Sequence, residues 1–259
     1  MTNGECILET QALSVNFGGL KAVDKVDMKV FRGEIHGVIG PNGAGKTTFF
    51  NMLTGFVEPV SGKILFKGTN ITGFAPHKAA AFGMCRSFQN IKLFKSMTVL
   101  ENVKVGFHYK LKTNLLDAVF RGSRYHRDEK YIIDRGMELL KSMGLDQYAD
   151  MKAANLAYGT QRRLEIARAL ASDPDILLLD EPAAGMNPSE TSELTTCIRE
   201  INKTGRTIVV IEHDMKLIMN LCHVITVLNQ GIKICEGDAQ KVRNDPQVIQ
   251  AYLGRSAAE

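Results

Sequence analysis

Three short, mostly apolar runs punctuate the chain, each bounded by Gly, Pro or Asp. They are residues 34–40, 175–181 and 207–214. Strands buried on both faces have this pattern, because helices on either side of a parallel sheet keep both faces away from water. The sequence therefore predicts a parallel sheet covered by helices.

Helical stretches lie between and after these runs. They are predicted at residues 45–53, 161–171, 189–202 and 215–222. This alternation of strands and helices is typical of an α/β core. Near the N-terminus, residues 6–17 and 62–71 favour sheet edges or hairpins, with turns at Gly62 and Lys63 and at Lys67 and Gly68. We therefore expect a small antiparallel layer beside the parallel sheet.

The middle of the chain has a different pattern. From about residue 96 to 151, apolar residues recur at helical spacing, as at Leu111, Leu115, Leu116, Val119 and Phe120. The segment predicts a helical subdomain inserted into the α/β core. Because no repeat appears and each motif occurs once, we expect residues 1–259 to form a single domain.

Composition narrows the class of protein. With 259 residues, 44% hydrophobic and 23% charged, the chain is typical of a globular protein with a sizeable core. No apolar run approaches the ~18–20 residues of a membrane span, and a net charge of +4 is too small by itself to indicate nucleic-acid binding. Five scattered cysteines, an odd number without a Cys-x-x-Cys pair, favour reduced thiols.

A glycine-rich stretch, GPNGAGKT at residues 40–47, follows a predicted strand, opens a predicted helix and matches G-x-x-x-x-G-K-[ST]. Glycines let the backbone curl so that consecutive N–H groups surround a phosphate, and the helix dipole adds positive potential there. We expect Lys46 to reach the β- and γ-phosphates of a nucleotide and the Thr47 hydroxyl to bind Mg²⁺. The predicted nucleotide contacts are Gly40, Asn42, Gly43, Ala44, Gly45, Lys46, Thr47 and Thr48.

Two later strands end on residues that suit phosphate chemistry. Asp180 and Glu181 close the run at 175–181, and successive residues at a strand end face opposite ways. In a nucleotide site, Asp180 is expected to hold Mg²⁺ and Glu181 to polarise the attacking water. His213 closes the next run, and parallel strands bring their carboxyl ends to one crevice. We therefore expect His213 to contact the γ-phosphate.

The turn before residues 161–171 is unusual for the start of a helix. Ala157 stands at the position of the N-cap, where Ser, Thr, Asp or Asn would satisfy the free amides of the first turn. Helix stability alone does not account for an alanine there. We therefore expect this turn to serve another purpose.

Taken in order, these features resemble the ATP-binding cassette (ABC) ATPases over almost the whole chain. The matching features are Phe17, residues 40–47, Gln89, residues 156–160, Asp180 with Glu181, residues 183–187 and His213. The resemblance implies an α/β fold with a P-loop NTPase (RecA-like) core, a small antiparallel β layer and an inserted helical subdomain. Residues 1–88 and 160–259 would form the core, and residues 89–159 the helical subdomain with the signature motif at its end.

Further roles come only from this resemblance. Phe17 would stack on the adenine of ATP, and Gln89 would contact Mg²⁺ and report the γ-phosphate. The signature motif, usually Leu-Ser-Gly-Gly-Gln, corresponds to Leu156, Ala157, Tyr158, Gly159 and Thr160. In this family the signature faces the nucleotide bound to a second cassette, so its helix need not satisfy its own first turn.

The signature departs from the family pattern. Ala157 lacks the usual serine hydroxyl, Tyr158 replaces a glycine, and Thr160 replaces glutamine. Backbone N–H groups survive these changes, but the missing hydroxyl would remove on the order of 1.5–3 kcal/mol of phosphate contact. Asn187 stands where the family usually has aspartate. We therefore expect altered communication between the two cassettes.

One branch of the family fits best. The residues YG and QRRLEIARAL, followed by AAGMNP and IEHDM, are similar to the ATP-binding subunits of branched-chain amino-acid importers. The resemblance implies ATP and Mg²⁺ as cofactors, and membrane permease subunits and a second ABC ATPase subunit as partners. A substrate-binding protein would act indirectly, and no nucleic acid is expected. The chain would work as a peripheral protein on the cytoplasmic side of the membrane.

Other functions remain open at this point. ATPases of lipopolysaccharide-type exporters share the cassette and much of its spacing. ABC ATPases that act on nucleic acid or ribosomes usually carry tandem cassettes or coiled-coil arms, and this sequence has neither. A P-loop kinase or GTPase would not explain the signature-like turn or His213. The sequence does not decide the transported molecule, the direction of transport, or whether the second cassette is another copy of this chain.

Overall fold

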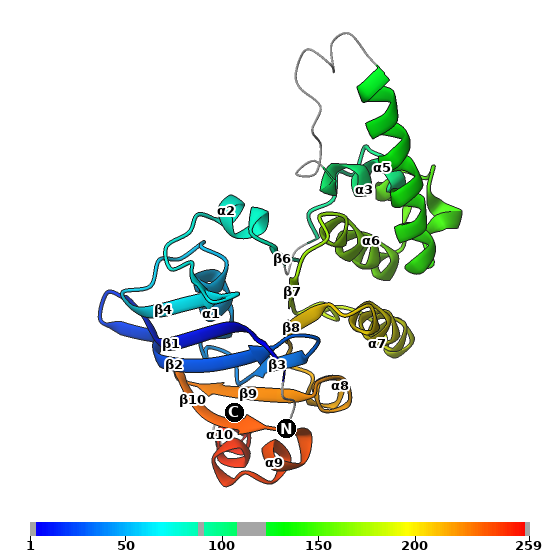
Figure 1. The fold of residues 1–259 in the computed structure, drawn as a ribbon. Helices are drawn as coiled ribbons and strands as arrows, with labels where there is room; N and C mark the ends of the chain where they lie inside the picture. Colours follow the sequence, from blue (N-terminus) through cyan, green and yellow to red (C-terminus); the bar gives the residue numbers. More distant parts are fainter. Residues whose placement is uncertain (1–3, 88–90, 108–122, 257–259) are drawn as a thin grey trace.

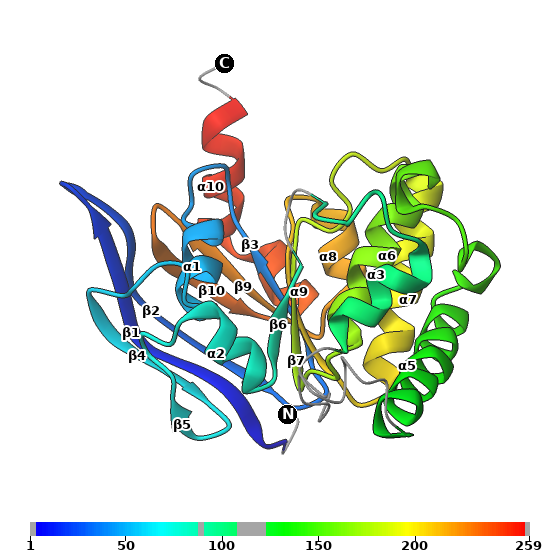
Figure 2. The same cartoon turned by 90° about the horizontal axis from the view of Figure 1, so that it is seen from above.

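A computed structural model gives the positions of residues 4–87, 91–107 and 123–256 (Figure 1). Two β-sheets form the part of the molecule that contains both ends of the described chain. Helices α3, α5 and α6 form a group on the side of the larger sheet that faces away from the smaller sheet, as Figures 1 and 2 both show. The α/β class and the antiparallel layer expected from the sequence are both confirmed.

The larger sheet has six strands in the order β10-β9-β3-β8-β7-β6. They are β3 (Ile35–Ile39), β6 (Met84–Arg86), β7 (Ile176–Asp180), β8 (Thr207–Ile211), β9 (Val224–Asn229) and β10 (Ile232–Gly237). All neighbouring pairs are parallel except β9 with β10. Every residue of β3, β7 and β8 is buried, which confirms the parallel strands predicted from the continuous apolar runs.

The smaller sheet is antiparallel, with the order β2-β1-β4-β5. Its strands are β1 (Cys6–Phe17), β2 (Leu20–Phe31), β4 (Ser61–Phe66) and β5 (Thr69–Asn70). The turn predicted at Lys67 and Gly68 is confirmed, but the turn predicted at Gly62 is wrong, because Gly62 lies inside β4. A Cβ atom built on Gly62 would lie 2.5 Å from the Ala12 carbonyl oxygen, so glycine is needed for close approach to β1.

The helices connect and cover the sheets. They are α1 (Lys46–Leu53), α2 (Pro76–Ala81), α3 (Val99–Gly106), α5 (Ser123–Ser142), α6 (Tyr158–Leu170), α7 (Pro188–Lys203), α8 (Met215–Leu221), α9 (Ala239–Asn244) and α10 (Pro246–Ser256), with 3₁₀ turns at Asp146–Tyr148 and Ala153–Asn155. No helix in the described ranges combines the length and apolarity needed to cross a membrane. The helical pattern at residues 111–120 lies outside the described residues.

Helix α6 differs most from its prediction. It begins at Tyr158, three residues before the predicted start at residue 161, so the last three residues of the signature motif lie in its first turn. It packs against α3 and α5. The division predicted between residues 159 and 160 therefore falls within this first turn, and the domain boundaries stay a prediction.

The core lies on both faces of the larger sheet. Along β7 and β8, alternate side chains enter two different apolar clusters. Leu177 and Val210 pack on the side of α3, α6 and α7, whereas Leu178 and Val209 pack on the side of α1 and the smaller sheet. This two-sided burial fixes the register of the strands, because a shift by one residue would exchange the two faces.

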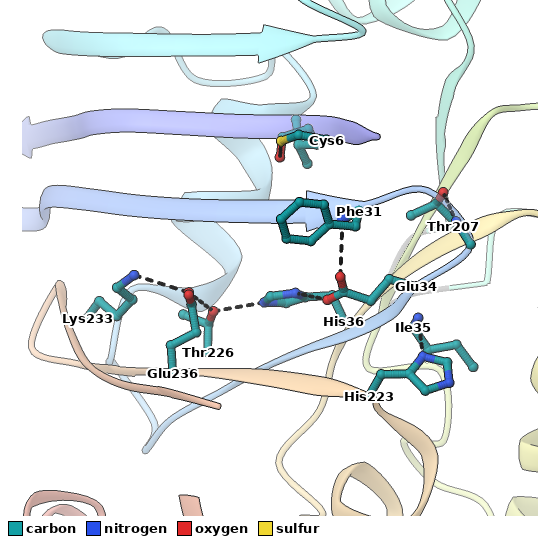
Figure 3. A network of polar contacts seen from close by, with 12 residues as sticks. Cys6, Phe31, Glu34, Ile35, His36, Thr207, His223, Thr226, Lys233 and Glu236 are labelled. Carbon is teal, nitrogen blue, oxygen red and sulfur yellow. Dashed lines mark hydrogen bonds and ion pairs between the residues drawn. The ribbon is translucent and has the colours of Figure 1, made fainter. Parts of the chain in front are cut away.

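A polar network ties β3 to the neighbouring strand β9 and, through β9, to β10 (Figure 3). His36 is fully buried, with its Nδ1 atom 2.6 Å from Glu34 Oε1 and its Nε2 atom 2.8 Å from Thr226 Oγ1. Thr226 Oγ1 donates to Glu236 Oε2 (2.9 Å), which also accepts from Lys233 Nζ (3.1 Å). Because buried polar groups are stable only when they are hydrogen-bonded, this network fixes the strand that leads into residues 40–47.

Candidate nucleotide site

The glycine-rich loop curls between β3 and α1. Gly40 has φ 155° and Gly45 has φ 98°, values that favour glycine. A Cβ atom on Gly40 would lie 2.1 Å from the Leu228 carbonyl oxygen, and one on Gly45 would lie 2.4 Å from the Ala22 carbonyl oxygen. Gly45 is also the N-cap of α1 and makes no side-chain cap. The first amides of α1 are thus left without a side-chain cap at the loop.

Lys46 is held inside this loop. Its Nζ atom donates to the carbonyl oxygens of Gly40 (2.7 Å) and Pro41 (3.0 Å), and the residue is only 6% exposed. The ammonium group is therefore placed among the backbone groups of the loop rather than in open water. A buried lysine beside a row of amides is an arrangement that attracts phosphate.

A cavity of about 670 Å³ opens in front of the loop. Its lining comes from the loop and α1, from the end of β1 and the start of β2, and from Glu181 after β7. The lining residues are Phe17, Leu20, Lys21, Ala22, Asn42, Gly43, Ala44, Gly45, Lys46, Thr47, Thr48, Glu181 and Gln230. Phe17 is 51% exposed, so its ring is available to a flat ligand at the edge of the cavity.

Asp180 is buried at the end of β7, in an ion pair that the sequence did not reveal. Its Oδ2 atom accepts a hydrogen bond from Arg86 Nη2 at 2.5 Å, and Arg86 Nη1 donates to Asn51 Oδ1 and Thr54 Oγ1 at the end of α1. The Asp180 Oδ1 atom is buried and has no hydrogen-bond partner among the described residues. A buried anionic oxygen left in this way requires a partner, and Mg²⁺ with its bound water prefers oxygen ligands. This oxygen of Asp180 therefore suits Mg²⁺, but Asp180 is not among the residues that line the cavity with Thr47, so the Mg²⁺ roles of Asp180 and Thr47 stay predictions.

Glu181 and His213 follow neighbouring strands at the same edge of the sheet. Asp180 pairs with Ile211 in the register of β7 and β8, so both carboxyl ends meet there as the sequence predicted. Glu181 lines the cavity, and its N–H donates to the Ile211 carbonyl oxygen (2.9 Å). His213 is 59% exposed and is not part of the cavity lining. The roles expected for both residues stay predictions.

Glu212 connects the two strand ends and was missed from the sequence. It is 1% exposed, and its two carboxylate oxygens accept hydrogen bonds from the N–H groups of Ala183 (2.8 Å) and His213 (3.2 Å). Burial raises the pKa of the Glu212 carboxyl, although these hydrogen bonds and the neighbouring His213 act in the opposite direction. Glu212 therefore fixes the loop after Glu181 relative to the segment that carries His213.

The signature residues lie away from this cavity. Ala157 is the N-cap of α6 and makes no side-chain hydrogen bond, as the sequence predicted. Leu156 and Gly159 are buried, whereas Ala157 and Tyr158 are exposed. None of residues 156–160 belongs to the cavity lining. Gln89, the remaining predicted site residue, lies outside the described residues.

The site residues that were not identified from the sequence differ in how close they lie to a recognised motif. Arg86 stands three residues before Gln89 and Glu212 directly before His213, so each is close to a recognised position. Nothing local indicates that Arg86 reaches Asp180, because 94 positions separate them. Gln230 and residues 20–22 enter the cavity only because β2 and the turn between β9 and β10 fold beside the loop.

Comparison with known protein families gives two matches. The ABC transporter family matches residues 23–184, and the family described as Branched-chain amino acid ATP-binding cassette transporter matches residues 233–258. The chain is 46% identical to the High-affinity branched-chain amino acid transport ATP-binding protein LivG of Escherichia coli (strain K12), over 96% of this chain and 98% of that protein. It is 45% identical to the protein BraF of the same description from Pseudomonas aeruginosa, over 96% and 98% of the two chains.

Solved structures show the same fold. The ADP conformation of MJ1267, an ATP-binding cassette of an ABC transporter, superposes with a TM-score of 0.84 at 31% identity and covers 96% of this chain and 99% of that chain. A dimeric structure of the cassette MJ0796, bound to ADP and Pi, has a TM-score of 0.75 at 23% identity and covers 90% and 99% of the two chains. At that level of identity, the second likeness concerns the fold alone.

Proposed function

Because the chain belongs to the ABC transporter family of ATP-binding proteins, we propose that it is the ATP-hydrolysing subunit of an importer for branched-chain amino acids. The match of residues 233–258 to the branched-chain amino-acid family carries the choice of branch. The likeness to the Escherichia coli and Pseudomonas aeruginosa proteins supports it over almost the full length. An exporter of the lipopolysaccharide type is not favoured by any of these matches.

The cavity beside the glycine-rich loop binds ATP in this proposal. Phe17 stacks on the adenine ring, while Lys46 and the uncapped amides of α1 hold the phosphates. Thr47, Asp180 and Gln89 hold Mg²⁺, which when bound neutralises charge on the phosphates. Residues 40–48 thus bind the phosphates of ATP in this proposal.

Hydrolysis requires a base and a closed site. Glu181 lies in the same cavity as Lys46 and polarises the attacking water, and His213 contacts the γ-phosphate from the neighbouring strand. Leu156, Ala157, Tyr158, Gly159 and Thr160 close the corresponding site of a second cassette, since they lie away from the cavity of their own chain. Two cassettes therefore enclose two ATP molecules between them, and closure precedes hydrolysis.

A groove beside β6 suits the membrane partner. It has a volume of about 390 Å³ and lies between the segment that contains α2 and β6 and the pair α3 and α6. Phe56 (52% exposed) and Val105 (39% exposed) line it, together with Arg168. A cytoplasmic helix of a permease subunit seats here, because an apolar groove with a charged rim is the usual receptor for an amphipathic helix.

The partners follow from this arrangement. Permease subunits supply the path through the membrane, and a substrate-binding protein delivers the amino acid to them without touching this chain. The chain itself works on the cytoplasmic face as a peripheral subunit, paired with a second ABC ATPase that is either another copy or a different chain. The resemblance to the ATP-binding subunits of branched-chain amino-acid importers favours a different chain.

Co-purification tests the transporter assignment. The tagged chain is purified from detergent-solubilised membranes, and the proteins that elute with it are identified. We expect multi-span membrane proteins and a second ATP-binding cassette, and we expect their presence to stimulate ATP hydrolysis. Recovery of ribosomes or DNA-associated proteins instead would contradict transport.

Uptake into membrane vesicles tests the substrate. Vesicles with this chain and ATP on the inside, and the substrate-binding protein on the outside, should accumulate labelled leucine. The matched control is the same complex with Glu181→Gln, which keeps the shape of the side chain but removes its negative charge and the base. Failure of the wild-type complex to accumulate leucine would contradict the substrate assignment, and equal accumulation by both complexes would contradict the role of Glu181 in driving uptake.

A further inference from the structure

Tyr158 makes a contact that a glycine at this position would lack. Its hydroxyl, in the first turn of α6, donates a hydrogen bond to the Ala184 carbonyl oxygen at 3.0 Å. The ring also lies along the next residue, since a Cβ atom built on Gly185 would be 3.6–3.8 Å from atoms of the tyrosine. Because residue 185 is a glycine, with φ 77°, no side chain separates the ring from the loop backbone. The signature turn is thus joined directly to the loop at residues 183–187.

The same loop begins at Glu181. The Ala184 N–H donates to the Glu181 carbonyl oxygen (3.2 Å), so Ala184 closes a turn that starts at the proposed base. The Ala183 N–H is held by Glu212 (2.8 Å). Any displacement of the Ala184 carbonyl therefore changes a turn whose first residue lines the nucleotide cavity.

The far end of the loop also lies against the signature turn. Asn187 and Glu190 form a reciprocal capping box at the start of α7, with both hydrogen bonds at 3.0 Å. A Cβ atom built on Gly159 would lie 3.0 Å from Glu190 Oε1, so these groups are in close contact. The first turn of α6 therefore touches the loop on both sides, at Ala184 through Tyr158 and at Glu190 through Gly159.

We propose that Tyr158 is a positioning residue that couples phosphate bound at the start of α6 to Glu181 in the cavity of the same chain. The proposal rests on the proposed function, in which that phosphate belongs to the nucleotide of the second cassette. Phosphate at the start of α6 fixes the first turn, the tyrosine hydroxyl fixes Ala184, and the Glu181–Ala184 turn holds the base in place. One hydrogen bond thereby makes hydrolysis in one site depend on occupancy of the other.

Tyr158→Phe tests this link, because it removes the hydroxyl and keeps the ring. In the assembled transporter we expect kcat for ATP hydrolysis to fall by about 2- to 10-fold, the range for one neutral hydrogen bond. ATP affinity of the isolated chain should not change, because Tyr158 lies outside the cavity lining. The steepness of the dependence on ATP concentration should also decrease. Wild-type kcat and steepness in this variant would overturn the proposal.

A matched control separates coupling from stability. Tyr131 on α5 is 50% exposed and lies away from the loop, so Tyr131→Phe should leave kcat, steepness and the melting temperature unchanged. A structural role for Tyr158 alone would lower the melting temperature of the Tyr158→Phe chain without changing the steepness. Tyr158→Gly, which inserts the usual family residue, should reproduce the loss of steepness.

Amide exchange in the isolated chain gives a readout that does not need transport. Loss of the tyrosine hydroxyl should speed exchange of the Ala184 N–H by about 2- to 10-fold, because the turn that it closes loses one support. Unchanged exchange would overturn the link even if the transporter assignment holds. A wild-type chain that fails to assemble with membrane proteins would instead contradict the proposed function, while the exchange measurement still decides the link.

Discussion

The starts of four helices, α1, α3, α6 and α7, fall into two groups. Helices α3 and α7 begin with complete capping boxes, at Thr98 with Glu101 and at Asn187 with Glu190. Helices α1 and α6 begin at Gly45 and Ala157 without a side-chain hydrogen bond. The capping boxes satisfy amides of their own helices, whereas the first amides of α1 and α6 have no side-chain cap and bind phosphate in the proposed function.

The comparison is informative because the two uncapped starts lie in different surroundings. The start of α1 lies in a cavity with Lys46 and Glu181, so one chain supplies most of that site. The start of α6 lies outside this cavity. The short helix α2 also lacks a side-chain cap, but Pro76 at its first turn removes one of the amides that would need a partner. An uncapped start therefore indicates a ligand only together with the residues around it.

The largest expected effect concerns the cavity at the start of α1. Glu181→Gln should slow ATP hydrolysis by about 10²- to 10⁴-fold, the usual contribution of a general base. ATP binding should stay intact, because the phosphates are held by the loop. Single-turnover hydrolysis and equilibrium binding measure the two effects separately. Near-normal turnover would contradict the role of Glu181.

Lys46→Ala should lower ATP affinity itself, by about 10- to 10²-fold, because a charge-assisted contact to phosphate contributes roughly 1.5–3 kcal/mol. Titration of the isolated chain with a fluorescent ATP analogue measures this change. Lys21→Ala is a suitable control, since Lys21 also lines the cavity but pairs with Asp24 on the surface. Equal losses in the two variants would show that general charge, rather than the loop, holds the nucleotide.

Ala157→Ser tests the start of α6 and should have a smaller effect. The new hydroxyl restores a phosphate contact, so ATP hydrolysis by the assembled cassettes should rise by up to about 10-fold. ATP affinity of the isolated chain should not change, because residue 157 lies outside the cavity. An unchanged rate would show that the backbone amides of α6 are sufficient.

The smallest effect is expected at a capped start. Thr98→Ala removes the cap of α3, so the free energy of unfolding should fall by about 1 kcal/mol, as at other N-caps. Both ATP affinity and the hydrolysis rate per folded molecule should stay the same. Chemical denaturation of the isolated chain measures the first and nucleotide titration the second. A loss of activity without a loss of stability would remove the distinction between capped and uncapped starts.

The parts of the fold that were predicted correctly depend on short segments. β3, β7 and β8 were predicted because each is a continuous apolar run, and the loop at residues 40–47 because its glycines and lysine are contiguous. β2 was missed although Val26, Met28 and Val30 are buried in alternation, since lysines and aspartates separate them. β6 has three residues, too few for a periodic signal.

The site was predictable to the extent that its residues follow strand ends. Asp180, Glu181 and His213 were found in this way, and their strands are neighbours in the sheet. The pairing of Arg86 with Asp180 was not predictable, because it depends on how β6 packs beside β7. The contact of Tyr158 with Ala184 likewise requires the loop after β7 to fold against α6.

The backbone of Glu181 has a consequence for how this protein changes under selection. Its φ of 44° is in the left-handed region, which costs about 1–3 kcal/mol for a residue with a side chain. Glycine would relieve that strain and remove the carboxylate. A population selected only for heat tolerance would therefore tend to lose the glutamate. A population selected for growth on a scarce nutrient would retain it. The residue found at position 181 therefore indicates which of the two selection pressures was stronger.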